Sequence, residues 1–170
     1  MFRISGISRK GKVQSVEKWS MTIHRLFSKD PNDEEENVTQ NIYVFRFILF
    51  CIIVYSFEML LNSVDIFIVD KTIFTRGYVT GCLFAAVYVL ILLHLGLEHP
   101  LTKYVSITAV SLIIMAASVS LTYHMIIIIM MPIIIAGMYT SKQLSIYTFV
   151  LTVLSIIIST YAGYYYGVCD

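Results

Sequence analysis

Long apolar runs dominate the chain from residue 42 onward, and their lengths predict membrane-spanning helices. A helix needs about 20 mostly apolar residues to cross the hydrocarbon core of a bilayer. Residues 104–139 are almost unbroken apolar sequence, and as one helix they would be roughly 54 Å long, nearly twice the thickness of that core. We therefore divide them at Tyr123-His124. The pattern predicts five spans, at about 42–61, 78–97, 104–122, 125–140 and 144–164.

The fourth predicted span is short and contains a proline. Isoleucine favours strands, and four isoleucines follow one another at 126–129. A lone strand in lipid cannot satisfy its backbone hydrogen bonds, so we expect a helix here. Pro132 predicts a kink near its middle, and Ala136-Gly137 predict close packing just beyond the kink. We expect this segment to cross the membrane; as a re-entrant segment it would move Asp170 to the other side.

The N-terminal 40 residues follow a different pattern. Apolar residues recur at three- and four-residue spacing at Val16, Trp19, Ile23, Leu26 and Phe27. This spacing predicts an amphipathic helix at about 14–28, which lies on the membrane surface or docks on a partner domain. Asp30 as N-cap and Pro31 at the first helical position then predict the start of a helix that runs into the first span.

Composition and charge support a membrane protein. The 170 residues are 58% apolar and 14% charged, with a mean hydropathy of +0.78. Thirteen of the 23 charged residues lie in residues 1–40. We therefore predict an all-α fold: a cytoplasmic tail, residues 1–40, followed by a polytopic bundle of five transmembrane helices, residues 41–170. The net charge of +1 gives no reason to expect a nucleic-acid partner.

The distribution of basic residues predicts the orientation. Seven Lys and Arg residues precede the first span, which places the N-terminus in the cytoplasm of a cell whose plasma membrane holds the bundle. With five crossings, the loops that contain Lys103 and Lys142 also lie inside, and Asp170 lies outside. The lipid bilayer is the partner that this pattern predicts directly.

Two sets of small residues predict helix contacts. Gly77, Gly81 and Ala85 have the small-xxx-small spacing that lets two helices approach closely. In the last span, small and hydroxyl residues follow one face at Ser145, Thr148, Thr152, Ser155, Ser159 and Ala162. We predict that both faces pack against helices, which is also a route to a homodimer; a polar pathway lined by the hydroxyls is the alternative.

Ionisable residues are rare in the predicted spans. Arg46 and Glu58 are twelve residues apart, roughly 18 Å along a helix, so they cannot pair. Each can extend to its own interface, or Glu58 can face a polar cavity in the bundle.

A histidine-rich group ends the second predicted span. His94, Glu98 and His99 lie close together in the sequence, and a glutamate four residues after a histidine can share its helix face, which makes a metal site one interpretation. The small number of ligands favours an interfacial histidine pair instead. We therefore predict no metal and no cofactor.

The run 131-MPIIIAGMYTSKQLSIYTFVLTVLSIIISTYAGYYYG-167 resembles the N-terminal membrane module of Gram-positive bacterial signalling proteins. The shared features are a short span centred on a proline, a Tyr-x-x-Lys loop (139-YTSK-142), and a Thr/Ser-rich span that ends in aromatics and glycine. In that family the module precedes a cytoplasmic output domain, often a diguanylate cyclase and less often a histidine kinase. This chain has no GGDEF or GGEEF loop and no histidine-kinase motif, so no catalytic residue is carried over.

These features lead to two expectations about function. The first is a non-enzymatic sensor or anchor module of a bacterial signalling protein, corresponding to a truncated membrane part of a diguanylate cyclase-type receptor. The alternative is a small substrate-binding or transport subunit, because transporters build substrate sites from broken helices. We expect no enzyme, since intramembrane catalysis needs paired ionisable or nucleophilic groups at membrane depth, and here only Glu58 and the hydroxyl face are candidates.

Overall fold

The protein is described by a computed structural model that covers residues 19–27, 36–66, 70–121 and 126–165. Every regular element in these ranges is a helix, which confirms the all-α class. A helix over residues 19–27 comes first. The bundle helices are α2 (Glu36–Ser63), α3 (Lys71–Leu95), α4 (Thr102–Leu121), α5 (Ile126–Ile129), α6 (Met131–Met138) and α7 (Lys142–Tyr165).

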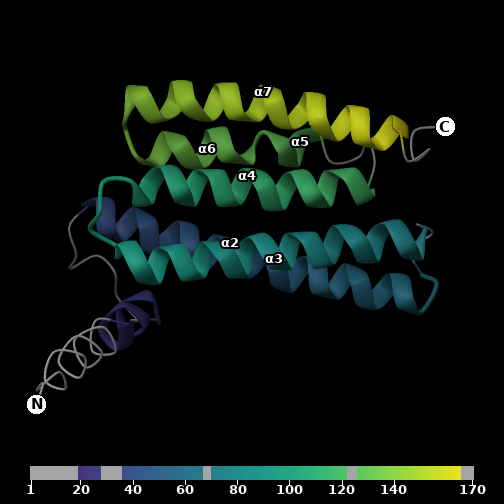
Figure 1. Cartoon of the computed structure of the whole chain (residues 1–170), viewed down its shortest axis with the longest axis horizontal. Coiled ribbons are helices and arrows are strands. Elements are labelled where there is room, and N and C mark those ends of the chain that lie inside the picture. The colour runs from purple at the N-terminus through teal and green to yellow at the C-terminus, as the bar shows by residue number, and fades with distance from the viewer. Residues whose placement is uncertain (1–18, 28–35, 67–69, 122–125, 166–170) are drawn as a thin grey trace, which may run out of the picture.

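The bundle helices lie side by side along one long axis (Figure 1). α3 packs on α2 and α4, and α7 packs on α4 and α6. Helix 19–27 lies beside the end of the bundle at which α2, α4 and α7 begin (Figure 1), and we call this the docked end. The far end is the one at which α3 begins and α7 ends.

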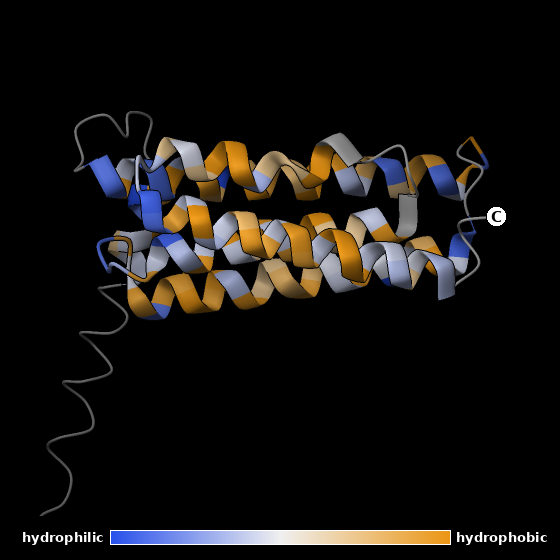
Figure 2. Cartoon of the chain, turned by 90° about the horizontal axis from the view of Figure 1, so that it is seen from above, coloured by the Kyte–Doolittle hydropathy of each residue, from blue (hydrophilic) through white to orange (hydrophobic). Residues whose placement is uncertain are grey.

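Four of the helices are long and apolar enough to cross a membrane. They are Glu36–Ser63, Lys71–Leu95, the Thr102–Val119 part of α4, and Lys142–Tyr165. Hydrophobic residues predominate along the middle of the bundle, and hydrophilic residues gather mostly toward its ends (Figure 2). These observations support a multi-pass membrane protein, and the four helices correspond to the first, second, third and fifth predicted spans.

The segment predicted as the fourth span is divided into two short helices. α5 has 4 residues and α6 has 8, and Met130 separates them. Pro132 lies in the first turn of α6, where its missing N–H breaks no helical hydrogen bond. The predicted kink in a continuous helix is therefore wrong: the helix stops before the proline and a new one starts around it.

The predicted packing at Ala136-Gly137 holds for only one of the two residues. Ala136 is fully buried, whereas a Cβ added at Gly137 would meet nothing within 4 Å. Gly137 faces outward, so it does not bring α6 close to a neighbour.

The second span begins earlier than its hydropathy predicts. α3 starts at Lys71 and not near residue 78, because the Asp70 side chain accepts hydrogen bonds from the backbone N–H groups of Thr72 at 2.8 Å and Ile73 at 3.0 Å. This N-cap satisfies backbone donors that the first turn leaves unpaired. Asp30 and Pro31, the predicted start of the first span helix, lie outside the described residues, as do residues 14–18 and 28 of the predicted amphipathic helix.

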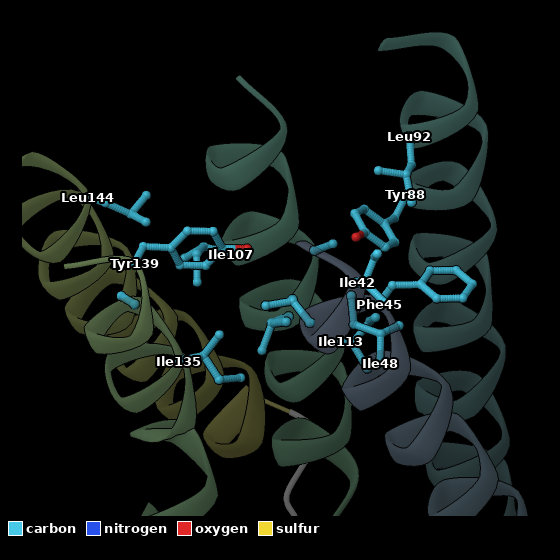
Figure 3. Packing of buried hydrophobic residues seen from close by; sticks show 14 of the residues in the cluster. Ile42, Phe45, Ile48, Tyr88, Leu92, Ile107, Ile113, Ile135, Tyr139 and Leu144 are labelled. Carbon is cyan, nitrogen blue, oxygen red and sulfur yellow. The ribbon is translucent and has the colours of Figure 1, made fainter. Parts of the chain in front are cut away.

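The main core is built between α2, α3, α4, α6 and α7. Buried apolar residues from all five helices form one cluster, which includes Ile42, Tyr88, Ile107, Ile135 and Leu144. In Figure 3, Tyr139 and Tyr88 enter this core from opposite sides, and their hydroxyl groups point inward. The core therefore carries polar atoms near the docked end, and these atoms lead to the candidate site.

Candidate functional site

Helix 19–27 is held against the docked end by its own apolar face. Leu26 is 2% exposed and Thr22 is also buried. The Nε of Arg46 on α2 donates a hydrogen bond to the Leu26 carbonyl at 3.3 Å, where a cation stabilises the last carbonyl groups of a helix. Arg46 therefore fastens this helix to α2.

An ion pair also attaches helix 19–27 to the turn between α3 and α4. Nη1 of Arg25 lies 2.8 Å from Oε1 of Glu98, in the turn between α3 and α4. Exposed pairs of this kind contribute little to stability, about 0–1 kcal/mol. The Arg25–Glu98 pair therefore sets where the helix sits, and burial of Leu26 supplies most of its binding.

Part of the amphipathic face stays uncovered. Trp19 and Ile23 are each 46% exposed and Phe27 is 65% exposed. These three residues repeat at four-residue spacing, so they lie on one side of the helix, next to the side that contacts the bundle. The ring of Phe27 also makes an edge contact with Phe45 on α2, with centroids 5.8 Å apart. The helix thus has one face on the bundle and an adjoining apolar face that the bundle covers only in part.

At the same end of the bundle lies a set of buried and part-buried hydrogen bonds that we call the polar junction. It consists of Gln40 and Asn41 of α2, the carbonyl groups of Leu97 and Met138, and Tyr139. Asn41 is 2% exposed, its Nδ2 donates to the Leu97 carbonyl at 2.8 Å, and its Oδ1 accepts from the Tyr139 hydroxyl at 2.8 Å.

Gln40 completes the junction on the next position of α2. Its Nε2 donates to the Met138 carbonyl at 2.6 Å and to Oε1 of Glu36 at 3.3 Å. Its Oε1 is buried and has no hydrogen-bond partner among the described residues. One short stretch of α2 therefore binds both turns of the docked end, α3–α4 through Leu97 and α6–α7 through Met138 and Tyr139.

Further hydrogen bonds stabilise the same end of the core. Tyr88 on α3 and Ser106 on α4 share a hydrogen bond of 3.1 Å between their hydroxyl groups. The Thr102 hydroxyl donates to the Gly96 carbonyl at 2.7 Å. Amides, phenols and alcohols in this arrangement hold helices in place; they do not form a nucleophile–base pair. The junction fits a conformational role better than a catalytic one.

Two of the three residues considered for a metal site, Glu98 and His99, make hydrogen bonds within the protein. Glu98 pairs with Arg25, and Nδ1 of His99 accepts a hydrogen bond from the backbone N–H of Leu101 at 3.2 Å. His94 is exposed in the last turn of α3. Within the described ranges, no three His, Cys, Asp or Glu side chains lie close enough to hold a metal ion.

Of the glycine set, Gly81 lies against α2. A Cβ at Gly81 would lie 3.5 Å from Cε1 of Tyr55 on α2. Ala85 packs at the edge of the main core, and half-buried Gly77 lines a cavity between α3 and α4. The set therefore serves contacts with both α2 and α4.

The hydroxyl face of α7 is directed mostly into the bundle. Four of its predicted members are buried, Thr148, Thr152, Ser155 and Ser159; Ala162 is half-buried and Ser145 is exposed. The Thr148 hydroxyl donates back to the Leu144 carbonyl at 2.7 Å, as hydroxyl groups in helices commonly do. Because this face packs on α4 and α6, it is not free for the predicted homodimer, which stays a prediction.

Glu58 lies beside a cavity of about 180 Å³ between α2, α4 and the α5–α6 segment. The rest of the wall is almost entirely apolar, with Phe47, Ile113 and Ile128 among its members. No partner for the Glu58 side chain occurs among the described residues. Glu58 is half-buried beside this cavity, whose wall is apolar and not polar as the cavity interpretation expects, and both interpretations of Glu58 stay predictions.

Sequence patterns missed the residues of the polar junction. Gln40 fell in the predicted tail, Asn41 lay at its boundary, and Tyr139 drew notice only as part of the Tyr-x-x-Lys loop. A usable signal was the amide pair 40-QN-41 directly before a long apolar run, because buried amides need partners. Its partners, however, are in turns that are distant along the chain.

Neither a protein-family model, nor a curated protein, nor a solved structure matches this chain.

Proposed function

We propose that this chain is a non-enzymatic sensor or anchor module of a bacterial membrane signalling protein, of the kind that precedes a diguanylate cyclase or a histidine kinase. A change in helix packing would pass through the polar junction to helix 19–27, and from there to the cytoplasmic tail. The observation that carries the proposal is the position of this helix, directly on the two elements, α2 and the α3–α4 turn, that Asn41 ties together.

The uncovered face of helix 19–27 supports a position at the membrane surface. Trp19 and Ile23 are suited to the boundary between headgroups and acyl chains, where aromatic residues concentrate. Besides the Arg46 hydrogen bond and the Phe27–Phe45 contact, this helix is held by one buried leucine, which contributes about 1.5–3 kcal/mol, and one exposed ion pair. Its attachment is therefore weak compared with that of the bundle helices, which bury many apolar side chains. Weak attachment suits an element that must change position when the bundle changes.

A spin-label experiment tests this coupling. Labels on cysteines introduced at Ser20 and Leu101, with the native cysteines replaced by alanine, report the distance between helix 19–27 and the α3–α4 turn. We expect a narrow distribution in the unmodified background and a broad one after Leu26→Ser, which removes the apolar anchor. Asn41→Ala should also broaden it, because Leu97 in this turn loses its hydrogen bond.

Asn37→Ala is the matched control, since Asn37 is exposed one turn earlier on α2. If Asn41→Ala gives a distribution as narrow as Asn37→Ala while Leu26→Ser broadens it, the junction does not communicate with the helix, and the proposed mechanism fails.

The proposal includes five membrane crossings with a cytoplasmic N-terminus. It is supported by the direction of the helices: α4 and α7 run the same way (Figure 1), so the segment that contains α5 and α6 returns between them.

We expect alkaline phosphatase fused after Asp170 to be active in a bacterial host with a periplasm, and a fluorescent protein fused there to be dark. Fusions after Thr140 should give the opposite result. Fluorescence after Asp170 would contradict the fifth crossing.

The transport-subunit alternative has less support. Apart from Glu58, the cavity beside the broken α5–α6 segment offers mostly apolar walls, whereas substrate sites at broken helices usually present several polar or backbone groups.

A further inference from the structure

A groove between α3 and α4 opens at the far end of the bundle, away from helix 19–27. Its deeper part is a cavity of about 220 Å³ with apolar walls that include Ile73, Phe84, Met115 and Val119. Arg76 and Thr80 line this cavity and also a shallower hollow beside it, where Thr72 and Thr75 supply hydroxyl groups. The two hollows therefore adjoin at Arg76 and Thr80, the shallower one mostly polar and the deeper one mostly apolar.

The charge at the mouth of this groove is not neutralised. Lys71 pairs with Asp65 at 2.7 Å, but Arg76 has no carboxylate partner among the residues that the structure describes. An exposed guanidinium on a membrane helix extends to the interface, and its fork of N–H donors matches the oxygen atoms of a phosphate.

The dimensions of the groove fit one leaflet of a bilayer. Arg76 is the sixth residue of α3, so its backbone lies roughly 8 Å inside the helix end, within reach of the headgroup region. From Arg76 to Phe84 the groove runs about 12 Å toward the membrane centre, against about 15 Å for the hydrocarbon of one leaflet. A molecule with a phosphate at one end and an acyl chain at the other matches both parts.

We propose that the α3–α4 groove binds a phospholipid, with the headgroup phosphate on Arg76 and an acyl chain along Phe84 and Met115. A headgroup with a net negative charge binds better than a zwitterionic one, because the unpaired Arg76 meets no compensating cation from the ligand. This site is separate from the polar junction and does not depend on the proposed signalling function.

Native mass spectrometry of the purified, delipidated full chain tests the proposal, with phosphatidylglycerol and phosphatidylcholine as probes. We expect about fivefold more phosphatidylglycerol than phosphatidylcholine to be retained, the ratio typical of one basic residue near a membrane surface. Arg76→Gln should abolish this preference. Thr80→Trp, which places an indole where the two hollows meet, should reduce retention of both lipids.

Lys142→Gln is the control, because it removes one exposed positive charge at the docked end. The proposal is overturned if Arg76→Gln behaves like Lys142→Gln, or if Thr80→Trp retains both lipids as the unmodified chain does. Displacement of phosphatidylglycerol by millimolar inorganic phosphate would identify a site for free anions and would also overturn it. Circular dichroism and gel filtration confirm that the variants remain folded.

Discussion

Replacing Asn41 with alanine is expected to lower the free energy of unfolding by about 2–3 kcal/mol, the largest effect of any single polar substitution in the bundle. The substitution removes one hydrogen-bond partner from each of two buried groups, the Leu97 carbonyl and the Tyr139 hydroxyl. Denaturation of the detergent-solubilised protein, followed by circular dichroism, measures the change.

Two companion variants separate the hydrogen bonds of Asn41 from general effects of truncation. Asn37→Ala removes the same side chain from an exposed position on α2 and should change the stability by less than about 0.5 kcal/mol. Tyr139→Phe removes the hydroxyl that donates to Asn41. The costs of Tyr139→Phe and Asn41→Ala should overlap in the double variant, because both remove the Asn41–Tyr139 hydrogen bond. An Asn41→Ala protein as stable as Asn37→Ala would mean that the junction contributes nothing.

The second large effect is expected at Gly81, where the size of the substituent decides the outcome. An alanine Cβ would lie 3.5 Å and 3.8 Å from two ring carbons of Tyr55, an ordinary contact, so Gly81→Ala should be neutral or slightly stabilising. The longer leucine side chain would place further carbon atoms in the space that the Tyr55 ring occupies. We expect Gly81→Leu to cost about 1–3 kcal/mol.

Tyr55 cannot easily move away from such a side chain. Its ring makes edge contacts with Phe74, at 5.3 Å between centroids, and with Tyr78, at 5.4 Å. Gly137→Leu is the control, because nothing lies within 4 Å of a Cβ at that position. In the same denaturation assay, the free energy of unfolding of Gly137→Leu should be close to that of the unmodified protein. Equal stability of the two leucine variants would show that α2 and α3 are not held closely at Gly81.

Much of the helical architecture could be predicted because lipid limits the choices of the backbone. Polar backbone groups in hydrocarbon must bond within a helix, so apolar length predicted five spans, and four of these correspond to long helices. The hydroxyl face of α7 was also predictable, since a three- and four-residue spacing fixes which residues share a helix face. In both cases the controlling interactions are local along the chain.

The division of the α5–α6 segment into two helices could not be predicted from apolar length. Its isoleucines and Pro132 predicted a kinked helix, whereas two helices meet at Met130 and the proline starts the second. Hydropathy cannot distinguish a kink from a break, because both expose the same apolar side chains. Neighbouring helices decide between them by the contacts that they offer to each half.

By itself the sequence determined an all-helical fold, four long helices that can span a membrane, and the inward face of α7, since these follow from hydrophobic length and helical period. Only the tertiary structure decided which residues contact one another at the docked end. Asn41 meets Leu97 across 56 positions and Tyr139 across 98, and Arg25 meets Glu98 across 73. Local periodicity carries no information about such pairs; they form because two turns, the start of α2 and one short helix are brought to the same end of the bundle.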